Sequence, residues 1–479
     1  MRRAKIVATL GPALDDRETL AAAVKAGIDV VRLNFSHGDH DTHARRLEAV
    51  RELSVRIGRN VGSLADLQGP KIRLGSLPEA GIDLPTGSEV YLMPGYESLE
   101  TYESGGYPAC PVVYDGLAED LQPGSLVLID DGSIRLVVSR FDGAGVWARV
   151  VAGGVANSKK GVNLPGVGVS AAPLTEKDIQ DLKVAVELGV DWVALSFVRR
   201  PADVIDARER VAALGGECPI VAKLERPEAI DDLAAIVAVS DVVMVARGDL
   251  GVEIGPERVP AIQKEIIATA NAEGRPVITA TEMLESMVSS PRPTRAEASD
   301  VANAVFDGTD ALMLSGETAA GRFPVEAVRT MARIIEVAES SPQLMIGAVP
   351  STLGGKTART VARAACQVAA DVQAKALVVY SISGQSIQLV SKYRPTMPLV
   401  GLTPKETTRR RTALMWGVEA ALVPMKEQAS DLTESAERVL VDGNWAERGD
   451  TVVIVSGKPG TEAGTNQIVV HRIGDAIAG

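Results

Sequence analysis

The residues best suited to catalysis lie between Pro219 and Glu253, where two short apolar segments each end in charged side chains. The first segment leads into Lys223 and Glu225, which point to the same side of a strand because strand side chains alternate. The second leads into Asp249, where a new helical pattern begins. Carboxylate oxygens suit Mg²⁺, which keeps positions for substrate oxygens, and a fixed lysine suits developing enolate or phosphoryl charge. For this stretch alone, the alternative is a βαβ unit whose strand ends carry ordinary solvated charges.

The composition argues against several classes of protein. Three cysteines, Cys110, Cys218 and Cys366, are spread through 479 residues without a CxxC pair, which argues against a disulfide framework or a zinc site and favours a reducing compartment. Only four histidines are present, which argues against a histidine-rich metal site. A formal net charge of −12 disfavours non-specific binding to nucleic acid or to an anionic membrane. An anionic substrate would therefore have to meet a local positive site.

The length of the chain and its apolar runs indicate how many domains it has and where it resides. Its length predicts roughly two to four domains. The N-terminal residues are basic, but the apolar run that follows is too short for a signal peptide, and no run reaches membrane-spanning length. We therefore predict a cytoplasmic protein that binds neither membrane nor nucleic acid.

Strand-like apolar segments alternate with helical segments over most of the first 340 residues. Strands are predicted at 5–11, 30–36, 61–67, 192–198, 219–225, 241–247, 276–282 and 311–316. Between residues 69 and 169 the alternation stops, and short Val, Ile and Leu runs separated by Gly and Pro turns indicate an all-β insert. Eight β/α units predict a closed (β/α)8 TIM barrel, with an open doubly wound sheet as the alternative.

The pattern changes again after residue 340. A helix at 357–371 is followed by strands at 376–380, 398–402, 420–423 and 451–456 with helices between them, which predicts a separate, doubly wound α/β domain. The predicted organisation is thus a catalytic barrel of residues 1–69 and 170–340, a β-barrel insert of residues 70–169 after the third strand, and a C-terminal α/β domain of residues 341–479.

Polar residues repeatedly follow the predicted barrel strands. In TIM barrels the catalytic residues lie at the carboxyl ends of the strands. Seven of the strands here lead into such residues: Arg32 to His37, Asp66, Arg199 and Arg200, Lys223 and Glu225, Arg247 to Asp249, Thr281 and Glu282, and Ser315 to Glu317. One charged strand end is readily explained as a solvated cap, but seven that converge favour an active site.

Eight segments form an ordered series of motifs along the barrel and the insert: KIVATLGP, VVRLNFSHG, GPKIR, SKKGVNLPG, VARGDLGVEI, ATEMLESM, PRPTRAE and LMLSGETAAG. In these motifs the chain resembles the pyruvate kinase family. The resemblance implies transfer of a phosphoryl group from phosphoenolpyruvate to ADP, giving pyruvate and ATP in the last step of glycolysis. It also implies dependence on Mg²⁺ or Mn²⁺, an insert that closes over the nucleotide as a lid, and a homotetramer.

The resemblance also assigns roles at the strand ends. Lys223 would neutralise the transferred phosphoryl and the enolate oxygen, while Glu225 and Asp249 would hold Mg²⁺. The amides of Gly248 and Asp249, which open a helix, would take the substrate carboxylate, and the hydroxyl of Thr281 would hold the same carboxylate.

Further assignments by resemblance concern the phosphate, the nucleotide and the proton. Arg32 would clamp the phosphate. The nucleotide-binding positions would be Asn34, Phe35, Ser36, His37, Arg73, Lys160 and Arg200. Enolpyruvate would receive its proton from water linked to Thr281, Ser315 and Glu317, among which the resemblance does not choose.

One departure from the family concerns K⁺. Many members hold K⁺ with residues that match Asn34, Ser36, Asp66 and the carbonyl of Leu67, and they read DTKGPEIR where this chain reads DLQGPKIR. Lys71 replaces the family's glutamate, so we predict that its ammonium supplies the charge of K⁺ and that K⁺ is not required. The alternative is that Lys71 is solvated and that K⁺ still binds.

The last domain of the family binds a phosphorylated effector. Here the turn SISGQS, with Ser381, Ser383, Gly384 and Ser386, could cradle a phosphate through amides and hydroxyls, and residues 457–466 could close over it. The turn lacks the basic residues of some fructose-bisphosphate-binding relatives. A different sugar phosphate, a nucleotide monophosphate and no effector at all therefore stay open.

Two other functions stay open at this point. Another Mg²⁺ enolate barrel enzyme, such as a phosphoenolpyruvate mutase or an aldolase of the citrate-lyase type, would need no nucleotide lid, so dependence on ADP distinguishes it. A catalytically silent metabolite-binding regulator would keep the fold. Lys223, Glu225, Asp249 and Thr281 are all present, so nothing in the sequence supports such a loss.

Overall fold

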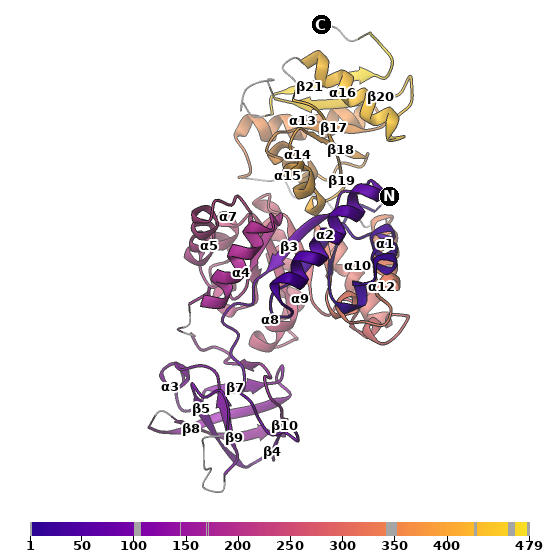
Figure 1. Ribbon diagram of the computed structural model, residues 1–479. Helices are drawn as coiled ribbons and strands as arrows, with labels where there is room; N and C mark the ends of the chain where they lie inside the picture. Colours follow the sequence, from indigo (N-terminus) through magenta and orange to yellow (C-terminus); the bar gives the residue numbers. More distant parts are fainter. Residues whose placement is uncertain are drawn as a thin grey trace.

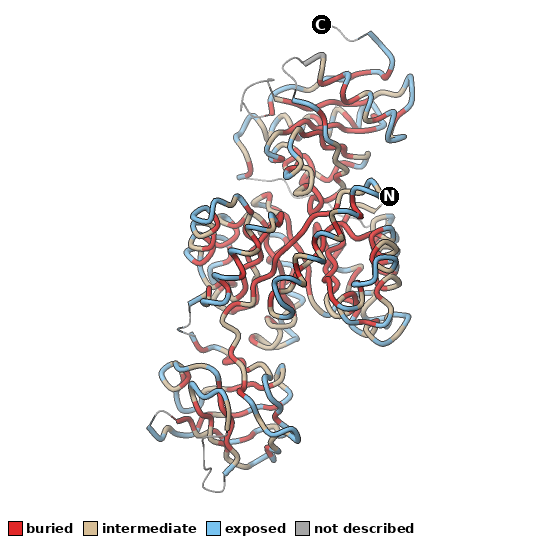
Figure 2. Tube along the Cα trace, viewed as in Figure 1, coloured by how far each residue is buried: buried red, intermediate tan, exposed pale blue. Residues whose placement is uncertain are grey.

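The computed structural model describes residues 2–99, 107–143, 145–168, 170, 172–341, 352–425, 429–457 and 465–476. The chain forms three bodies in a row, with the insert at one end, the barrel in the middle and the C-terminal domain at the other end (Figure 1). Buried segments run through the centre of each body (Figure 2). The insert and the C-terminal domain therefore meet different ends of the barrel.

Eight parallel strands close into the barrel, in the order β1-β16-β15-β14-β13-β12-β3-β2. They are β1 (Lys5–Thr9), β2 (Val30–Asn34), β3 (Gly62–Asp66), β12 (Trp192–Leu195), β13 (Ile220–Leu224), β14 (Val242–Ala246), β15 (Val277–Ala280) and β16 (Ala311–Leu314). The predicted TIM barrel is confirmed and the open sheet is excluded, because β1 pairs with both β2 and β16. Most strand residues are buried, as expected for parallel strands covered by helices on the outside.

Helices surround the barrel strands. They are α1 (Arg17–Ala26), α2 (His40–Ile57), α4 (Glu176–Glu187), α5 (Pro201–Ala213), α6 (Pro227–Asp231), α7 (Leu233–Val239), α8 (Arg247–Ile254), α9 (Val259–Ala272), α10 (Arg295–Asp307), α11 (Gly316–Ala319) and α12 (Pro324–Glu339), with short 3-10 turns η1 (Pro12–Leu14) and η2 (Glu285–Val288). Side chains that cap the first turn begin several of them: Asp39 accepts a hydrogen bond from Thr42 N, and Thr175 forms a capping box with Asp178.

The insert is all-β apart from the short helix α3 (Leu117–Asp120). Its strands are β4 (Ile82–Leu84), β5 (Glu89–Pro94), β6 (Ala109–Val112), β7 (Leu126–Ile129), β8 (Ile134–Asp142), β9 (Gly145–Ala152), β10 (Gly154–Ala156) and β11 (Val162–Asn163). They pair as a six-stranded sheet that runs from β11 to β6 and a two-stranded sheet of β10 and β4. Isolated bridges pair Arg73 with Gly161, beside the edge strand β11, and Leu74 with Val112, in the edge strand β6. Residues 73 and 74 therefore contact both edges of the larger sheet.

Two segments join the insert to the barrel (Figure 1). The outgoing crossing, residues 67–73, follows β3, and the return crossing, residues 161–168, precedes α4. Between them the insert has a core of its own, formed by residues such as Val90, Leu92, Val127 and Leu136. The position of the insert over the barrel therefore depends on these two crossings.

The C-terminal domain is a five-stranded sheet in the order β19-β18-β17-β20-β21. Its elements are α13 (Lys356–Asp371), β17 (Leu377–Tyr380), α14 (Gln385–Lys392), β18 (Leu399–Thr403), α15 (Glu406–Arg411), η3 (Thr412–Leu414), β19 (Val418–Leu422), α16 (Ala429–Asp442), β20 (Thr451–Ser456) and β21 (Gln467–Arg472). The predicted parallel strands are present. The antiparallel edge strand β21 was not predicted, and it pairs with β20 along its whole length.

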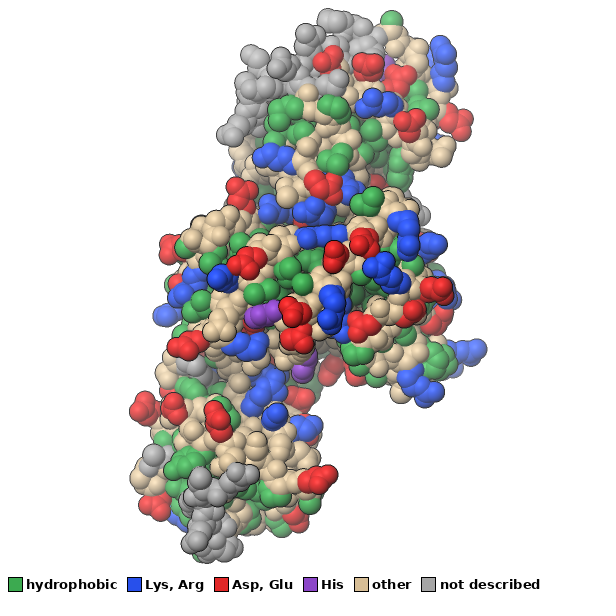
Figure 3. All heavy atoms as spheres, in the orientation of Figure 1, with side chains coloured by type: hydrophobic (Ala, Val, Ile, Leu, Met, Phe, Trp, Pro, Cys, Tyr) green, Lys and Arg blue, Asp and Glu red, His purple; other side chains and the backbone are tan. Residues whose placement is uncertain are grey.

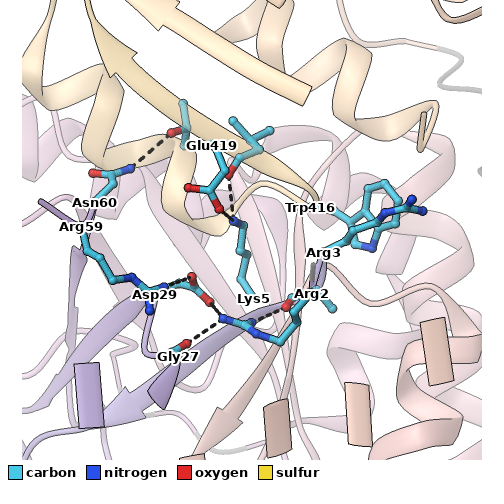
Figure 4. A network of polar contacts seen from close by, with 12 residues as sticks. Arg2, Arg3, Lys5, Gly27, Asp29, Arg59, Asn60, Trp416 and Glu419 are labelled. Atoms are coloured by element: carbon cyan, nitrogen blue, oxygen red, sulfur yellow. Dashed lines mark hydrogen bonds and ion pairs between the residues drawn. The ribbon is translucent and has the colours of Figure 1, made fainter. Parts of the chain in front are cut away.

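The C-terminal domain docks on the end of the barrel where the strands begin (Figure 4). Lys5 Nζ, at the start of β1, donates a hydrogen bond to Val418 O at 2.8 Å, and Asn60 Nδ2 donates to Arg409 O at 2.6 Å.

Acidic and basic side chains are interspersed over the face of the molecule in Figure 3. Within the described residues no helix is long and apolar enough to cross a membrane.

Candidate active site

Lys223 is the centre of a buried charge cluster at the carboxyl end of β13. Its ammonium lies 3.4 Å from Asp66 Oδ1 and 3.4 Å from Glu225 Oε2, and it donates a hydrogen bond to Ser196 Oγ at 2.6 Å. Burial by itself would lower the pKa of Lys223, but the facing carboxylates, Asp66 foremost, hold it above its usual value. The facing carboxylates therefore keep Lys223 positively charged at neutral pH.

Glu225 is buried directly behind the lysine. Its Oε1 accepts a hydrogen bond from Phe197 N at 2.7 Å, whereas its buried Oε2 accepts none from the described residues. Burial raises the pKa of Glu225 to about 7, with Asp249 adding to the rise and Lys223 opposing it. This carboxylate thus keeps an acceptor oxygen that is able to take a cation.

Asp249 lies in the first turn of α8, where a negative charge is favoured by the helix dipole. Lys71 reaches it from the outgoing crossing, with Nζ 3.3 Å from Asp249 Oδ1. The sequence predicts that the Lys71 ammonium supplies the charge of K⁺, whose positions would be Asn34, Ser36, Asp66 and the Leu67 carbonyl. In this structure its ion pair is with the Asp249 carboxylate on α8.

Asp66, at the end of β3, contacts two cationic side chains, Arg32 and Lys223. Arg32 Nε donates to Asp66 Oδ2 at 2.7 Å, and Lys223 faces Oδ1. Burial alone would raise the pKa of Asp66, but Lys223 and Arg32 hold it below its usual value. Of the other predicted K⁺ positions, Asn34 Oδ1 accepts a hydrogen bond from Ser36 N at 3.2 Å, and the Leu67 carbonyl accepts one from Ser196 Oγ at 2.7 Å.

Thr281 joins the end of β15 to the start of α8. Its Oγ1 accepts a hydrogen bond from Gly248 N at 2.7 Å, and its backbone is left-handed, with φ 67°. This conformation is strained for a β-branched residue and needs support from its surroundings. Arg247 Nη2 supplies that support by donating to Thr281 O at 2.7 Å, and Arg247 Nη1 donates to Asp300 Oδ1 at 2.7 Å.

Ser315 and Glu317 follow β16 on the next part of the rim. Glu317 is fully buried and accepts hydrogen bonds from Leu284 N at 3.0 Å and from Ser315 N at 2.6 Å. Burial raises its pKa. Ser315 Oγ is buried and has no hydrogen-bond partner among the described residues, so it is a hydroxyl that can serve a bound molecule.

The predicted nucleotide-binding residues are only partly brought together. His37 lies within the electrostatic reach of Arg73, Arg32 and Lys71, and its pKa is lowered, first by burial and then by these cations. By contrast, Lys160 forms an ion pair with Asp130 in the insert at 2.9 Å. Two further positions pair locally: Arg200 Nε lies 3.5 Å from Asp203 Oδ1, and Phe35 stacks on His43 with ring centroids 4.5 Å apart.

A cavity of about 870 Å³ lies between the rim of the barrel and the insert. Its barrel side includes Gly248, Asp249, Thr281 and Ser315, and its insert side includes Leu126, Leu128 and Arg135. Lys71, from the outgoing crossing, also lines it. The insert is therefore a wall of the candidate site.

The predicted effector turn lies between β17 and α14. Gly384 has a left-handed φ of 87°, which glycine adopts without strain, and its N–H donates to Ser381 Oγ at 3.0 Å. Thr465 Oγ1 and Ser386 Oγ are hydrogen-bonded at 2.6 Å, so the start of α14 meets the segment that precedes β21. Of the predicted closing segment 457–466, residues 458–464 lie outside the described residues.

Sequence reasoning gave no role to three residues that support this site. Ser196 binds the Lys223 ammonium, Phe197 N binds Glu225, and Arg247 binds the Thr281 carbonyl. Ser196 and Phe197 directly follow β12, so the rule that functional residues follow barrel strands also covers them. Arg247 was noted as a charge, but its partner is remote in sequence.

Comparisons with known proteins match both the barrel and the C-terminal domain to one family. The family model described as "Pyruvate kinase, barrel domain" matches residues 1–328, and the model described as "Pyruvate kinase, alpha/beta domain" matches residues 359–471. Curated relatives named "Pyruvate kinase" include one from Mycobacterium tuberculosis, 47% identical over 476 residues that cover 99% of each chain. Another from Corynebacterium glutamicum is 44% identical over 99% of this chain and 98% of the relative, and one from Bacillus licheniformis is 42% identical over 100% of this chain and 82% of the relative.

Proposed function

Because the chain belongs to the pyruvate kinase family and is a phosphotransferase, we propose that it transfers the phosphoryl group of phosphoenolpyruvate to ADP and releases pyruvate and ATP. One observation carries the proposal for this chain's own site. Lys223 is a fixed cation that faces Asp66 and Glu225 on the rim of the barrel, one strand away from the Gly248–Thr281 contact.

We propose the division of labour between domains that the sequence predicted. Residues 1–69 and 170–340 would form the catalytic barrel, residues 70–169 the lid, and residues 341–479 a regulatory domain. The cavity between the insert and the barrel rim supports the role of the insert as a lid over the nucleotide.

Glu225 and Asp249 would hold the divalent ion, Mg²⁺ or Mn²⁺. The buried Oε2 of Glu225 accepts no hydrogen bond from the described residues, although the Lys223 ammonium lies 3.4 Å from it, and hard carboxylate oxygens are the ligands that such ions prefer. Within the described residues no group of three or more His, Cys, Asp or Glu is arranged to hold a metal ion. When bound, the ion would supply positive charge that orients the substrate and stabilises charge on its oxygens.

The charged side chains would do most of the remaining work, because phosphoryl transfer depends mainly on positioning and charge stabilisation. The Lys223 ammonium would face the transferred phosphoryl and then the enolate oxygen. Arg32, oriented by its hydrogen bond to Asp66, would clamp the phosphate. His37 and Arg73 would lie on the nucleotide side, together with the other predicted nucleotide-binding positions.

The start of α8 would bind the substrate carboxylate. The amides of Gly248 and Asp249 belong to the first turn of this helix, where N–H groups lack helical partners and favour an anion; Gly248 N would exchange its present hydrogen bond to Thr281 Oγ1 for the carboxylate. The hydroxyl of Thr281 would donate to the same carboxylate, in place of its present hydrogen bond to Ala280 O.

Ser315 would hold the water that protonates enolpyruvate at carbon. Its hydroxyl is buried and without a partner among the described residues, whereas both oxygens of Glu317 accept backbone N–H groups. We therefore assign Glu317 the task of fixing the backbone of Ser315, and Ser315 the task of orienting the water beside Thr281.

We propose that K⁺ is not required. Asp66 already faces two cations, Arg32 and Lys223. Lys71 brings a third positive charge to the site, where it pairs with Asp249. A phosphorylated effector bound at the SISGQS turn and a homotetrameric assembly also remain proposals, taken from the family resemblance.

The first test follows pyruvate formation from phosphoenolpyruvate, ADP and Mg²⁺ in a buffer whose only monovalent cation is bulky and organic. Full activity that disappears when ADP is omitted is the expected result. The Lys71→Glu variant, which restores the family's glutamate, should need added K⁺. Wild-type activity that appears only with K⁺ would refute the role of Lys71, and no activity under any condition would favour the silent regulator.

A further inference from the structure

A second ion pair, buried beside the active site, has no role in the reaction described above. Arg226 directly follows Glu225, and its Nη1 donates to Glu253 Oε1 at 2.8 Å. The exposed fractions of Arg226 and Glu253 are 4% and 7%. Breaking a buried pair of this kind leaves an uncompensated charge, so both partners are held firmly.

The pair connects the two elements that carry the proposed metal ligands. Arg226 follows β13 next to Glu225, and Glu253 lies on α8 one turn after Asp249. Residues four apart on a helix lie on the same face. The distance between Glu225 and Asp249 is therefore linked to the Arg226–Glu253 contact.

The return crossing forms hydrogen bonds with both members of the Arg226–Glu253 pair. Arg226 Nη2 donates to Val167 O at 3.0 Å, and Asn163 Nδ2 donates to Glu253 Oε1 at 3.4 Å. Arginine can make both contacts at once because its planar guanidinium presents several donors in a fixed arrangement. One side chain thus bridges the return crossing, β13 and α8.

The outgoing crossing contacts the same helix one turn earlier, through the Lys71–Asp249 pair. A small cavity between the crossings is lined by Lys71, Asn163, Arg226 and Glu253. Both connections of the insert are therefore anchored on α8, at positions 249 and 253.

We propose that Arg226 is a positioning residue that couples the orientation of the insert to the two metal-binding carboxylates. Through Glu253 it holds α8, and with it Asp249, at a set distance from Glu225. Through Val167 it transmits movement of the insert to that distance. The inference rests on the proposed function, because it takes Glu225 and Asp249 as the metal ligands.

The first test measures Mn²⁺ binding to the full-length enzyme without substrates, by electron paramagnetic resonance of the free ion. Arg226→Lys keeps the charge but cannot bridge Glu253 and Val167 together, so we expect binding weaker by about tenfold, the usual cost of losing a group that orients metal ligands. Glu253→Gln should weaken binding similarly. Arg210→Lys is the matched control, because Arg210 pairs with Asp206 on the exposed face of α5, and it should bind Mn²⁺ like the wild type.

The second test measures hydrogen–deuterium exchange of peptides that span the return crossing, with and without Mg²⁺. Mg²⁺ should slow exchange there in the wild type and in Arg210→Lys, and not in Arg226→Lys. Wild-type Mn²⁺ affinity and Mg²⁺ protection in Arg226→Lys would overturn the inference while leaving the proposed function intact. If Arg226→Lys does not fold by circular dichroism, the same readouts in Glu253→Gln decide. A wild type that binds no Mn²⁺ would refute the metal site itself.

Discussion

At the scale of single residues, the candidate site consists of buried acidic and basic side chains whose opposite charges offset one another. Lys223 and Arg32 offset the buried Asp66, and Lys223 also offsets Glu225. Such groups interact more strongly than they would in water because solvent screens them little. Removing one of these four side chains therefore leaves the charges of its neighbours uncompensated, in addition to removing its own contact.

Lys223→Met should lower turnover by about 10²- to 10³-fold, the range seen when one preorganised stabilising group is lost. The methionine keeps the apolar stem of the side chain but leaves transition-state charge without its cation. Steady-state kinetics with phosphoenolpyruvate and ADP measure the effect. Mn²⁺ binding to the same variant is the control for an intact metal site, and unchanged turnover would refute the assigned role.

His43 should make the protein less stable in mild acid. Burial lowers its pKa below the usual 6.5, while its ring stacks on Phe35. The unfolded chain then binds the proton more readily than the folded one, so this group's contribution to stability is present above pH 6.5 and is lost as the pH falls through the folded pKa. Urea midpoints at about pH 7.5 and about pH 5.5 should differ more in the wild type than in His43→Gln. Equal differences would contradict the prediction.

At the scale of elements, the junction between β3, β12 and the outgoing crossing controls the position of Lys223. Gly69 has a left-handed φ of 70°, and a Cβ on it would lie 2.7 Å from Phe197 Cδ2 and 2.9 Å from Ser196 Cβ. Ser196 in turn binds the Lys223 ammonium, and Phe197 N binds Glu225. The close approach of glycine is thus required where the chain leaves the barrel for the insert.

Gly69→Ala should therefore cost both stability and activity. The backbone strain of a non-glycine residue in this region is about 1–2 kcal/mol, and displacement of Ser196 and Phe197 adds to it and disturbs Lys223. Gly58→Ala provides the control, because Gly58 has φ 71° but no atom within 4 Å of its Cβ position. Urea unfolding and kcat of both variants separate strain from displacement. The argument fails if Gly69→Ala behaves like Gly58→Ala.

At the scale of the whole molecule, the two outer bodies are attached to the barrel in different ways. The insert is connected by two crossings that are anchored on α8 beside the site. The C-terminal domain docks on the opposite end through a buried cluster, in which Lys392 Nζ lies 2.5 Å from Asp310 Oδ2 and 2.8 Å from Asn271 Oδ1. Burial lowers the pKa of Lys392 to about 8, against the pull of Asp310.

Lys392→Met should loosen this docking, because it leaves Asp310 buried with only Arg394, at 3.5 Å, as a cationic partner in the described part of the chain. Loss of one partner of a buried pair costs about 3–5 kcal/mol. Lys264→Met, which removes the pair with Asp307 at a lysine side chain that is 59% exposed, should cost at most about 1 kcal/mol. Urea unfolding of both variants measures the difference. Equal shifts would mean that the Lys392 contact does not hold the interface.

The sequence by itself determined the barrel, the insert and the C-terminal domain, because strand and helix periodicity is a local property of the chain. It also pointed to the rim residues, since closure of a parallel barrel brings every strand end to one face. Some predicted strands ran past the observed ends; for example, Glu225 and Arg247 follow β13 and β14 instead of belonging to them.

Only the tertiary structure decided which long side chains meet. Lys71 pairs with Asp249, Arg226 with Glu253, and Lys392 with Asp310, and none of these partners was predicted. Each pair joins residues from different elements, and the reach of a lysine or an arginine allows many partners until packing fixes the backbone. The edge strand β21 was missed for the same reason, because its antiparallel pairing depends on where β20 lies.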